Sequence, residues 1–307
     1  MLRIGFDIGG TTIKAGTVDD GMNVIEKRVL PTPRGDAEAL CALISTTVSE
    51  MLGGSVPDVL GVTVPGSVSS DGGILDAWNI GLRNVPLKAM LTGLIPAGRI
   101  IVKNDADAAA AAELKIGALA GVQTGLMLTL GTGVGGSIVL GGELFKGGQG
   151  RGTELGHAML DRGGRLCGCG HYGCIETLCS ATALKRLAEK ACNEGKGMIY
   201  CRASDGAQVD AKLAIDCAMA GDETALSIFE EYTDALADAV ASFVNVLDPQ
   251  VIVIGGGVSG AGDFLLDILR RKVPPRTFFG SCGAILLAAG GLAWIALRSR
   301  KQEAANV

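Results

Sequence analysis

Apolar residues recur along this chain at two spacings, one typical of buried strands and the other of amphipathic helices. Residues 2–7 and 13–18 are apolar runs on either side of a glycine-rich turn, and residues 23–30 predict a third strand. Residues 36–52 then carry apolar side chains at helical spacing. The opening therefore predicts a hairpin, a further strand and a helix.

Further elements follow, and from residue 126 onward the second half of the chain repeats the opening order. Short strands are expected at residues 59–64 and 100–103, and the alanine-rich run at residues 106–113 has high helix propensity. Residues 126–130 and 137–140 predict another pair of strands around a glycine turn. The remaining patterns predict helices at residues 181–194, 211–220 and 224–246 and a last strand at residues 251–254. Two related lobes, each built on a strand–glycine–strand unit, follow from the pattern.

Composition agrees with an α/β fold of two lobes. The 307 residues suffice for two domains of about 100–200 residues each. Hydrophobic residues make up 48% of the chain and aromatic residues only 4%, so the core must be aliphatic, which suits helices packed on sheets. The net charge is −5 and no basic stripe appears, which disfavours nucleic-acid binding. An anionic substrate must then be held by backbone amides, helix N-termini or a metal.

Neither a signal peptide nor a membrane span is predicted. The start of the chain lacks the apolar run of a signal peptide. The longest apolar stretch, residues 283–297, is shorter than the ~20 residues that span a bilayer, and we interpret it as a buried C-terminal helix. The nine cysteines should be reduced thiols unless they bind metal. We therefore expect a cytoplasmic protein.

The turn after the first strand carries candidate phosphate ligands. Glycines at Gly9 and Gly10 let the backbone approach a ligand, and the hydroxyls of Thr11 and Thr12 can bond phosphate oxygens. Asp7 can hold Mg²⁺ directly or through water. An ordinary hairpin turn is the alternative interpretation.

Two further glycine segments resemble this turn. Residues 131–137 resemble Gly-x-Gly-x-x-Gly, but no helix follows and no acidic partner has the dinucleotide spacing, so a Rossmann site is excluded. The Gly-Lys-Ser/Thr of a P-loop is also absent. Two glycine turns between apolar strands predict paired phosphate loops facing one nucleotide. Residues 255–259 end the last strand, where adenine can lie against bare backbone.

Asn104 and Asp105 stand between a predicted strand and the alanine-rich helix. Asp105 is a common type of helix cap. It is also a candidate general base that accepts a proton from a sugar hydroxyl during phosphoryl transfer. The two roles are compatible, because an aspartate at a helix N-terminus is kept ionised.

The most specific signal is a cluster of cysteines. Cys167, Cys169 and Cys174 are separated by glycines, with the spacing of zinc ligands. His171 inside the loop and His157 upstream are both candidates for the fourth ligand, and spacing does not choose between them. Three unrelated reduced cysteines are the alternative interpretation.

Taken together, these segments resemble the ROK family of bacterial sugar kinases and regulators, within the actin-like ATPase superfamily. The resemblance covers nearly the whole chain, in order and spacing. It rests on the motifs at residues 7–12, 64–66, 104–109, 131–136, 154–157, 167–176 and 255–259.

The resemblance implies an α/β fold of two actin-like (ribonuclease H-like) lobes with an interlobe cleft. The N-terminal lobe would hold residues 1–118 and a C-terminal helix at residues 284–305. The C-terminal lobe would hold residues 119–283, with a zinc-binding loop at residues 157–176. A homodimer is expected as well, because similar proteins are often dimers.

The resemblance also implies site residues, with ATP, Mg²⁺ and a structural Zn²⁺ as cofactors. Asp105 would be the catalytic base. It would accept the proton of a hexose hydroxyl, which we predict to be O6. Zinc would be held by His157 with Cys167, Cys169 and Cys174. Sugar contacts are expected at Gly66, Asn79, Asn104, Asp105, Glu154, His157 and Glu176. Nucleotide contacts are expected at Asp7, Gly9, Gly10, Thr11, Thr12, Lys14, Gly131, Thr132, Gly133, Gly135, Gly256 and Gly257.

The predicted activity is that of an ATP-dependent hexose kinase, with glucose as the expected acceptor. The alternatives are N-acetylmannosamine, N-acetylglucosamine, allose or fructose as acceptor, and a sugar-responsive regulator without catalysis. Two positions depart from the family pattern: Leu82 stands where an aromatic residue is frequent, and Thr153 replaces a usual glycine.

Overall fold

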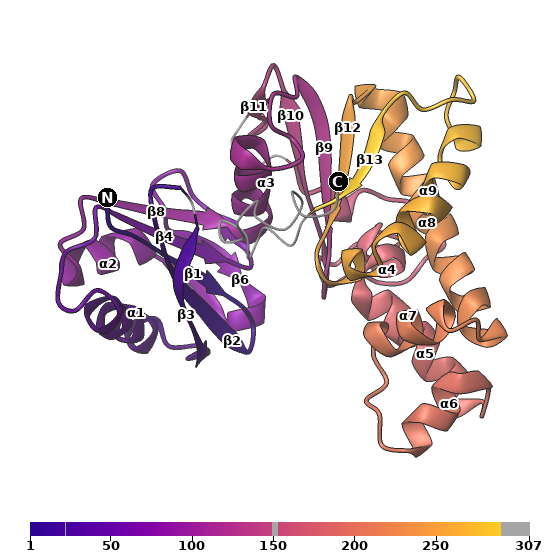
Figure 1. The fold of residues 1–307 in the computed structure, drawn as a ribbon, viewed down its shortest axis with the longest axis horizontal. Coiled ribbons are helices and arrows are strands. Elements are labelled where there is room, and N and C mark those ends of the chain that lie inside the picture. The colour runs from indigo at the N-terminus through magenta and orange to yellow at the C-terminus, as the bar shows by residue number, and fades with distance from the viewer. Residues whose placement is uncertain (22, 149–152, 290–307) are drawn as a thin grey trace, which may run out of the picture. The chain divides into compact units, whose positions relative to one another are not determined.

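The computed structural model describes residues 1–21, 23–148 and 153–289, which divide into two compact units (Figure 1). Unit 1 comprises residues 1–112 and 147–148, and unit 2 comprises residues 113–146 and 153–289. The division falls inside helix α3 (Asp105–Ile116), earlier than the predicted boundary after residue 118. A continuous helix therefore carries the chain from one unit into the other.

Unit 1 is built on a five-stranded sheet of order β3-β2-β1-β4-β8. Its strands are β1 (Arg3–Ile8), β2 (Thr12–Val18), β3 (Val24–Pro31), β4 (Val59–Val64) and β8 (Arg99–Asn104). The strands β1, β2 and β3 form an antiparallel meander, whereas β4 and β8 run parallel to β1. Helix α1 (Ala37–Met51) begins where the Asp36 carboxylate accepts the N–H of Ala39 at 2.9 Å, as an N-cap.

Unit 1 also contains a small sheet that the apolar pattern did not predict. Its strands are β5 (Ser67–Val68), β6 (Ile74–Ala77) and β7 (Leu82–Val85), with a 3₁₀ turn (Trp78–Ile80) and helix α2 (Leu87–Leu94). The strands are two to four residues long, too short to show a clear period of two.

Unit 2 is built on a second five-stranded sheet, of order β11-β10-β9-β12-β13. Its strands are β9 (Thr124–Leu130), β10 (Val134–Leu140), β11 (Glu143–Leu144), β12 (Val251–Gly255) and β13 (Ile285–Ala288). Its helices are α4 (Glu176–Cys179), α5 (Ala181–Asn193), α6 (Gly197–Ser204), α7 (Ala211–Met219), α8 (Glu223–Leu247) and α9 (Asp263–Lys272). Three 3₁₀ turns lie at Leu155–His157, Gly257–Ala261 and Pro274–Arg276. In Figure 1, α8 and α9 lie beside β12 and β13.

The two sheets share one topology. In each, the first three strands form an antiparallel meander and two later strands add in parallel beside the first. Each sheet also has a separate, mainly aliphatic core. This duplicated arrangement confirms the predicted α/β fold of two ribonuclease H-like lobes.

The predicted C-terminal helix at residues 284–305 was wrong at its start. Residues Ile285–Ala288 form β13, which pairs in parallel with β12 and belongs to unit 2. A short apolar run fits a buried strand as well as a buried helix, and β12 offered a free edge to pair with. Residues 290–305 lie outside the described residues. Within the described part of the chain, every helix is too short or too polar to cross a membrane.

Candidate active site and metal centre

The turn between β1 and β2 is shaped by backbone hydrogen bonds. The N–H of Gly9 donates to the carbonyl of Thr12 at 2.9 Å, and a side chain on Gly9 would press a Cβ against that same oxygen. Thr32 holds the turn from β3's end: its N–H donates to Thr11 O at 3.0 Å and its hydroxyl to Gly9 O at 2.7 Å. From outside, Thr32 therefore holds the turn at two of its carbonyl groups.

Asp7 lies at the base of this turn. The Thr63 hydroxyl donates to Asp7 Oδ1 at 2.8 Å, and Lys14 Nζ lies 4.0 Å from Oδ2. Lys14 is the cross-strand partner of Asp7 in the antiparallel pair. A carboxylate beside a turn that is predicted to bind phosphate fits a Mg²⁺ ligand, directly or through water. Thr63 was not predicted, because a lone threonine in a strand carries no motif.

Asn104, rather than Asp105, is the residue that caps α3. Its Oδ1 accepts the N–H groups of Ala106 at 2.8 Å and Asp107 at 3.1 Å. Its Nδ2 donates to the carbonyl of Gly66 at 3.0 Å. Asp105 adds a 2.9 Å hydrogen bond from the N–H of Ala106 but is not needed as the cap. The capping role considered for Asp105 thus belongs mainly to its neighbour.

Asp105 keeps an exposed surface, yet protein surrounds it on most sides. Partial burial raises the pKa of Asp105 to about 6, and the negative charge of Asp7 adds to the rise. The hydrogen bond from the N–H of Ala106 opposes it. Near neutral pH the carboxylate is ionised but basic enough to accept a proton, as a general base must.

Gly66 and Asn79 border this half of the site from the small sheet. A Cβ on Gly66 would collide with the backbone of Asp76 and Ala77, so only glycine fits there. Asn79 packs its carbonyl near Gly10, where an added Cβ would lie 3.3 Å from that oxygen. Gly66 therefore contacts Asn104, and Asn79 lies beside Gly10, through backbone carbonyl groups.

The turn between β9 and β10 is the counterpart in unit 2. The N–H of Gly131 donates to Gly133 O at 3.0 Å. The start of α5 holds the turn in place: the N–H of Ala181 donates to Gly131 O at 2.7 Å, and the Thr182 hydroxyl donates to Thr132 O at 2.6 Å. As in unit 1, a hydroxyl and an N–H from outside hold the carbonyls of the turn.

A pocket of about 520 Å³ opens beside this turn, within unit 2. It brings Thr132 together with Gly257 and Val258, as expected if the two glycine segments serve one nucleotide. Its other walls come mainly from α5, α7 and the residue just before α7. The sequence predicted both helices but not their place in a pocket, because amphipathic helix surfaces carry no motif. These walls include Thr182, Lys185, Asp210, Lys212, Ile215 and Met219.

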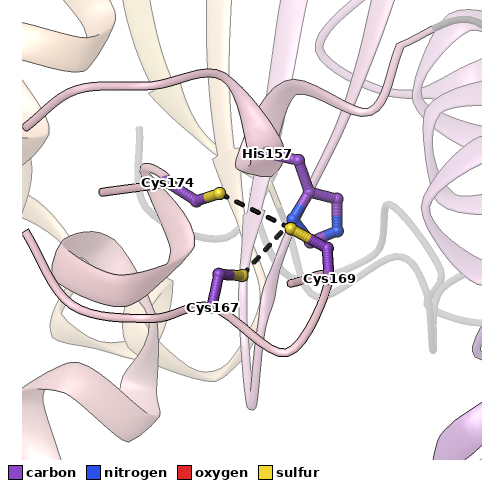
Figure 2. Close-up of side chains that lie close together, drawn as sticks. All are labelled: His157, Cys167, Cys169 and Cys174. Carbon is purple, nitrogen blue, oxygen red and sulfur yellow. Dashed lines mark hydrogen bonds between the residues drawn. The ribbon is translucent and has the colours of Figure 1, made fainter. Parts of the chain in front are cut away.

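Four side chains gather on the cysteine-rich loop (Figure 2). The ligand atoms of His157, Cys167, Cys169 and Cys174 all lie within 4.8 Å of one another. His157 Nδ1 lies 3.6 Å from Cys167 Sγ, and Cys169 Sγ lies 3.6 Å from Cys174 Sγ. One imidazole and three thiols form a donor set that suits tetrahedral zinc. The residues therefore fit a structural zinc ion.

His171, the other candidate ligand, is not one of these four. Its Nδ1 lies 3.6 Å from Cys169 Sγ. Its carbonyl accepts the N–H of Cys167 at 2.8 Å, which helps to close the loop. The structure thus brings His157, remote in sequence, into the group and gives His171 a place at its edge.

His157 is held by the glycine that precedes it. Gly156 lies against β10, where an added Cβ would collide with the carbonyl of Val134. Glu154 begins the same 3₁₀ turn and is exposed. The Glu-x-Gly-His motif is therefore pressed against the strand that leaves the glycine turn.

Thr153, just before this motif, has a φ of 74°. This left-handed conformation explains why glycine is usual at the position, since a β-branched residue is strained there by about 1–2 kcal/mol. We expect Thr153→Gly to raise the free energy of unfolding by about 0.5–1 kcal/mol, after the extra flexibility of glycine in the unfolded chain is subtracted. Chemical denaturation would measure the change. Thr153→Ala keeps the Cβ, so an equal gain in that variant would contradict the explanation.

Glu176 connects the glycine turn of unit 2 with the cysteine cluster. It begins α4, and its Oε2 accepts the N–H of Val134 at 3.0 Å, next to the glycine turn. Its Oε1 lies 3.4 Å from Cys167 Sγ. A Cβ on Gly133 would meet the Glu176 carboxylate, so a side chain there would displace Glu176 from its present position.

Comparison with known proteins agrees with the geometry. The sequence model described as "ROK family" matches residues 3–290. The glucokinase of Thermotoga maritima is 36% identical over 281 residues, covering 88% of this chain and 86% of the relative. The glucokinase of Halalkalibacterium halodurans is 39% identical over 279 residues, covering 87% and 84%.

Among solved structures, a ROK family glucokinase from Streptomyces griseus in complex with glucose and AMPPNP matches with a TM-score of 0.83. It is 32% identical, and the match covers 96% of this chain and 97% of that one. The family model spans both units, and the relatives share the fold over almost their whole length. The protein therefore belongs to the ROK family.

Proposed function

We propose that this ATP-dependent sugar kinase phosphorylates glucose at O6, with Asp105 as the general base. The environment of Asp105 carries this proposal: a carboxylate with a pKa raised to about 6 lies at the start of α3, near Asp7 and its phosphate-type turn. The relatives named glucokinase, and the similar structure that holds glucose and AMPPNP, support the choice of glucose.

In the proposed reaction, the residues of unit 1 handle the acceptor hydroxyl and the metal. Asp105 accepts the hydroxyl proton as the oxygen attacks the γ-phosphorus and the bond to ADP breaks. Asn104 and the backbone at Gly66 hold neighbouring hydroxyls, together with Asn79. Mg²⁺, when bound by Asp7, would neutralise the phosphate charge.

The residues of unit 2 hold nucleotide and sugar. The turn at Gly131–Gly133 would bond phosphate oxygens, and adenine would occupy the pocket beside Gly257. Glu154, His157 and Glu176 would bond sugar hydroxyls. The contact of His157 Nδ1 with the cysteine cluster supports a double role, because the metal would take Nδ1 and leave Nε2–H for the sugar.

The experiment that tests this function is an ADP-release assay over a panel of sugars, with zinc measured on the same sample. We expect the highest kcat/KM with glucose, ahead of N-acetylmannosamine, N-acetylglucosamine, allose and fructose. Glucose lacking its 6-hydroxyl should bind without turnover. No sugar-dependent ADP from any of them would refute the kinase, and turnover of the 6-deoxy sugar would refute the O6 assignment.

The raised pKa of Asp105 predicts the pH dependence of the reaction. A general base must be ionised, and the ionised fraction falls as pH drops through a pKa of about 6. At saturating ATP, kcat/KM for glucose should be level above about pH 7 and fall about tenfold per unit below about pH 6. A profile that stays level down to pH 4.5 would contradict the role of Asp105.

The expected homodimer stays a prediction, which light scattering on the purified protein would test.

A further inference from the structure

The segment at residues 176–182 holds the glycine turn of unit 2 at three points. Glu176 Oε2 accepts the N–H of Val134 at 3.0 Å, the N–H of Ala181 donates to Gly131 O at 2.7 Å, and the Thr182 hydroxyl donates to Thr132 O at 2.6 Å. At Thr132 and Gly131 these contacts use carbonyl groups only. The segment therefore holds two carbonyl groups of the turn and, through Glu176, the N–H of Val134 that follows it, while the Gly131–Gly133 hydrogen bond closes the turn from within.

The two oxygens of Glu176 have different partners. Oε2 is anchored on Val134, whereas Oε1 lies 3.4 Å from the sulfur of Cys167, a member of the cysteine cluster. When that cluster holds zinc, Cys167 is a thiolate and has no proton to donate. Oε1 then lacks a donor from Cys167 and is available to accept a hydrogen bond from a hydroxyl group.

We propose that Glu176 couples sugar binding to nucleotide binding within unit 2. A sugar hydroxyl on Oε1 fixes the carboxylate, and Oε2 then holds Val134 and the adjoining turn in one arrangement. Thr132 of this turn lines the nucleotide pocket, as does Thr182 of the same holding segment. Each substrate thus favours the turn geometry that the other one requires, and the coupling is reciprocal. This inference rests on the proposed function.

The coupling is measured as the ratio of AMPPNP dissociation constants without and with saturating glucose, by calorimetry on the zinc-loaded protein. We expect glucose to tighten AMPPNP binding about 5- to 50-fold in the wild type. Glu176→Gln offers one acceptor oxygen where two are needed, so the ratio should fall below about twofold. Its zinc content should stay unchanged, which shows that the loop is intact.

Glu154→Gln is the matched control. Glu154 is a second predicted sugar ligand, and among the described residues its side chain makes no hydrogen bond to the turn. This variant should weaken glucose binding while keeping the wild-type ratio once glucose is saturating. A wild-type ratio in Glu176→Gln, or an equal loss in both variants, overturns the inference.

Thr182 gives an independent pair of variants, since it is neither one of the four clustered metal-ligand residues nor a predicted sugar ligand. Thr182→Val removes the hydrogen bond to Thr132 and should lower the ratio, whereas Thr182→Ser keeps the hydroxyl and the ratio. Equal ratios in the two variants would contradict the role of this segment. A wild type that turns over glucose with a ratio of one overturns the inference alone. No sugar-dependent ADP from any hexose overturns the proposed function, and the inference with it.

Discussion

Replacing Asp105 with asparagine is expected to lower kcat for glucose phosphorylation by about 10²–10⁴-fold, the usual contribution of a general base. Asparagine keeps the shape and can still accept the N–H of Ala106, as Asp105 does at 2.9 Å. Asn104 also continues to cap α3. The fold and the glucose dissociation constant should therefore change little. A variant that retains near-normal turnover would show that another group takes the proton.

The same variant should be more stable than the wild type at neutral pH. The folded-state pKa of about 6 lies above the ordinary value of 3.8, so the folded protein disfavours the ionised carboxylate. A pKa shift of this size corresponds to about 3 kcal/mol of unfolding free energy. Because Asp105 is exposed to screening water, we expect the variant to gain only about 1 kcal/mol.

The stability gain should depend on pH in a defined way. At about pH 4, Asp105 is protonated in the folded chain and only partly ionised in the unfolded chain, so asparagine gains little stability. As pH rises through about 6, the wild type loses the stability that its protonated Asp105 gave. The difference in unfolding free energy between variant and wild type therefore reaches its full size above that pH. Denaturation at pH 4 and pH 7.5 measures it. A pH-independent difference would mean that charge is not its cause.

The second large effect is expected from loss of the metal centre. Cys174 is buried within the cluster, and Cys174→Ser should lose stoichiometric zinc. His157 would then no longer be aimed by the metal, and the KM for glucose should rise about 10- to 100-fold, as when metal ligands lose their orientation. Zinc content, glucose KM and hydrogen exchange over residues 157–176 are the measurements.

Matched variants separate this effect from general damage. Cys201 is exposed and lies outside the cluster, so Cys201→Ser should leave zinc and KM unchanged. His157→Ala should lose zinc, whereas His171→Ala should keep it. Retention of zinc by Cys174→Ser would refute the assignment, and loss of zinc in His171→Ala alone would make His171 the ligand.

Much of the fold was predictable because its signals are local. The strand at residues 59–64 and the helices beginning at Ala181 and Ala211 were found with their observed starting points. Sequence reasoning failed where the signal was weak or ambiguous. The short strands of the small sheet show no period, and Ile285–Ala288 became a strand because β12 had a free edge.

The candidate site divides in the same way. Spacing alone picked out the glycine turns and the three cysteines, because a tight turn and a metal loop are built from neighbouring residues. The walls of the pocket beside Thr132, by contrast, come mainly from helices whose surface residues have no recognisable spacing. Thr63 and Thr182 were missed for the same reason, since single hydroxyls are common everywhere.

The sequence by itself determined the chemistry that this chain carries: two phosphate-type turns, Asp105 at a helix start, and a zinc-like cysteine loop. Only the tertiary structure decided how those groups are tuned. Packing raised the pKa of Asp105, mainly by burial and further through the charge of Asp7, and brought His157 to the cysteines. It also set Glu176 between Val134 and Cys167. Hydrogen bonds and charge interactions act through space, so their partners depend on folding rather than on distance along the chain.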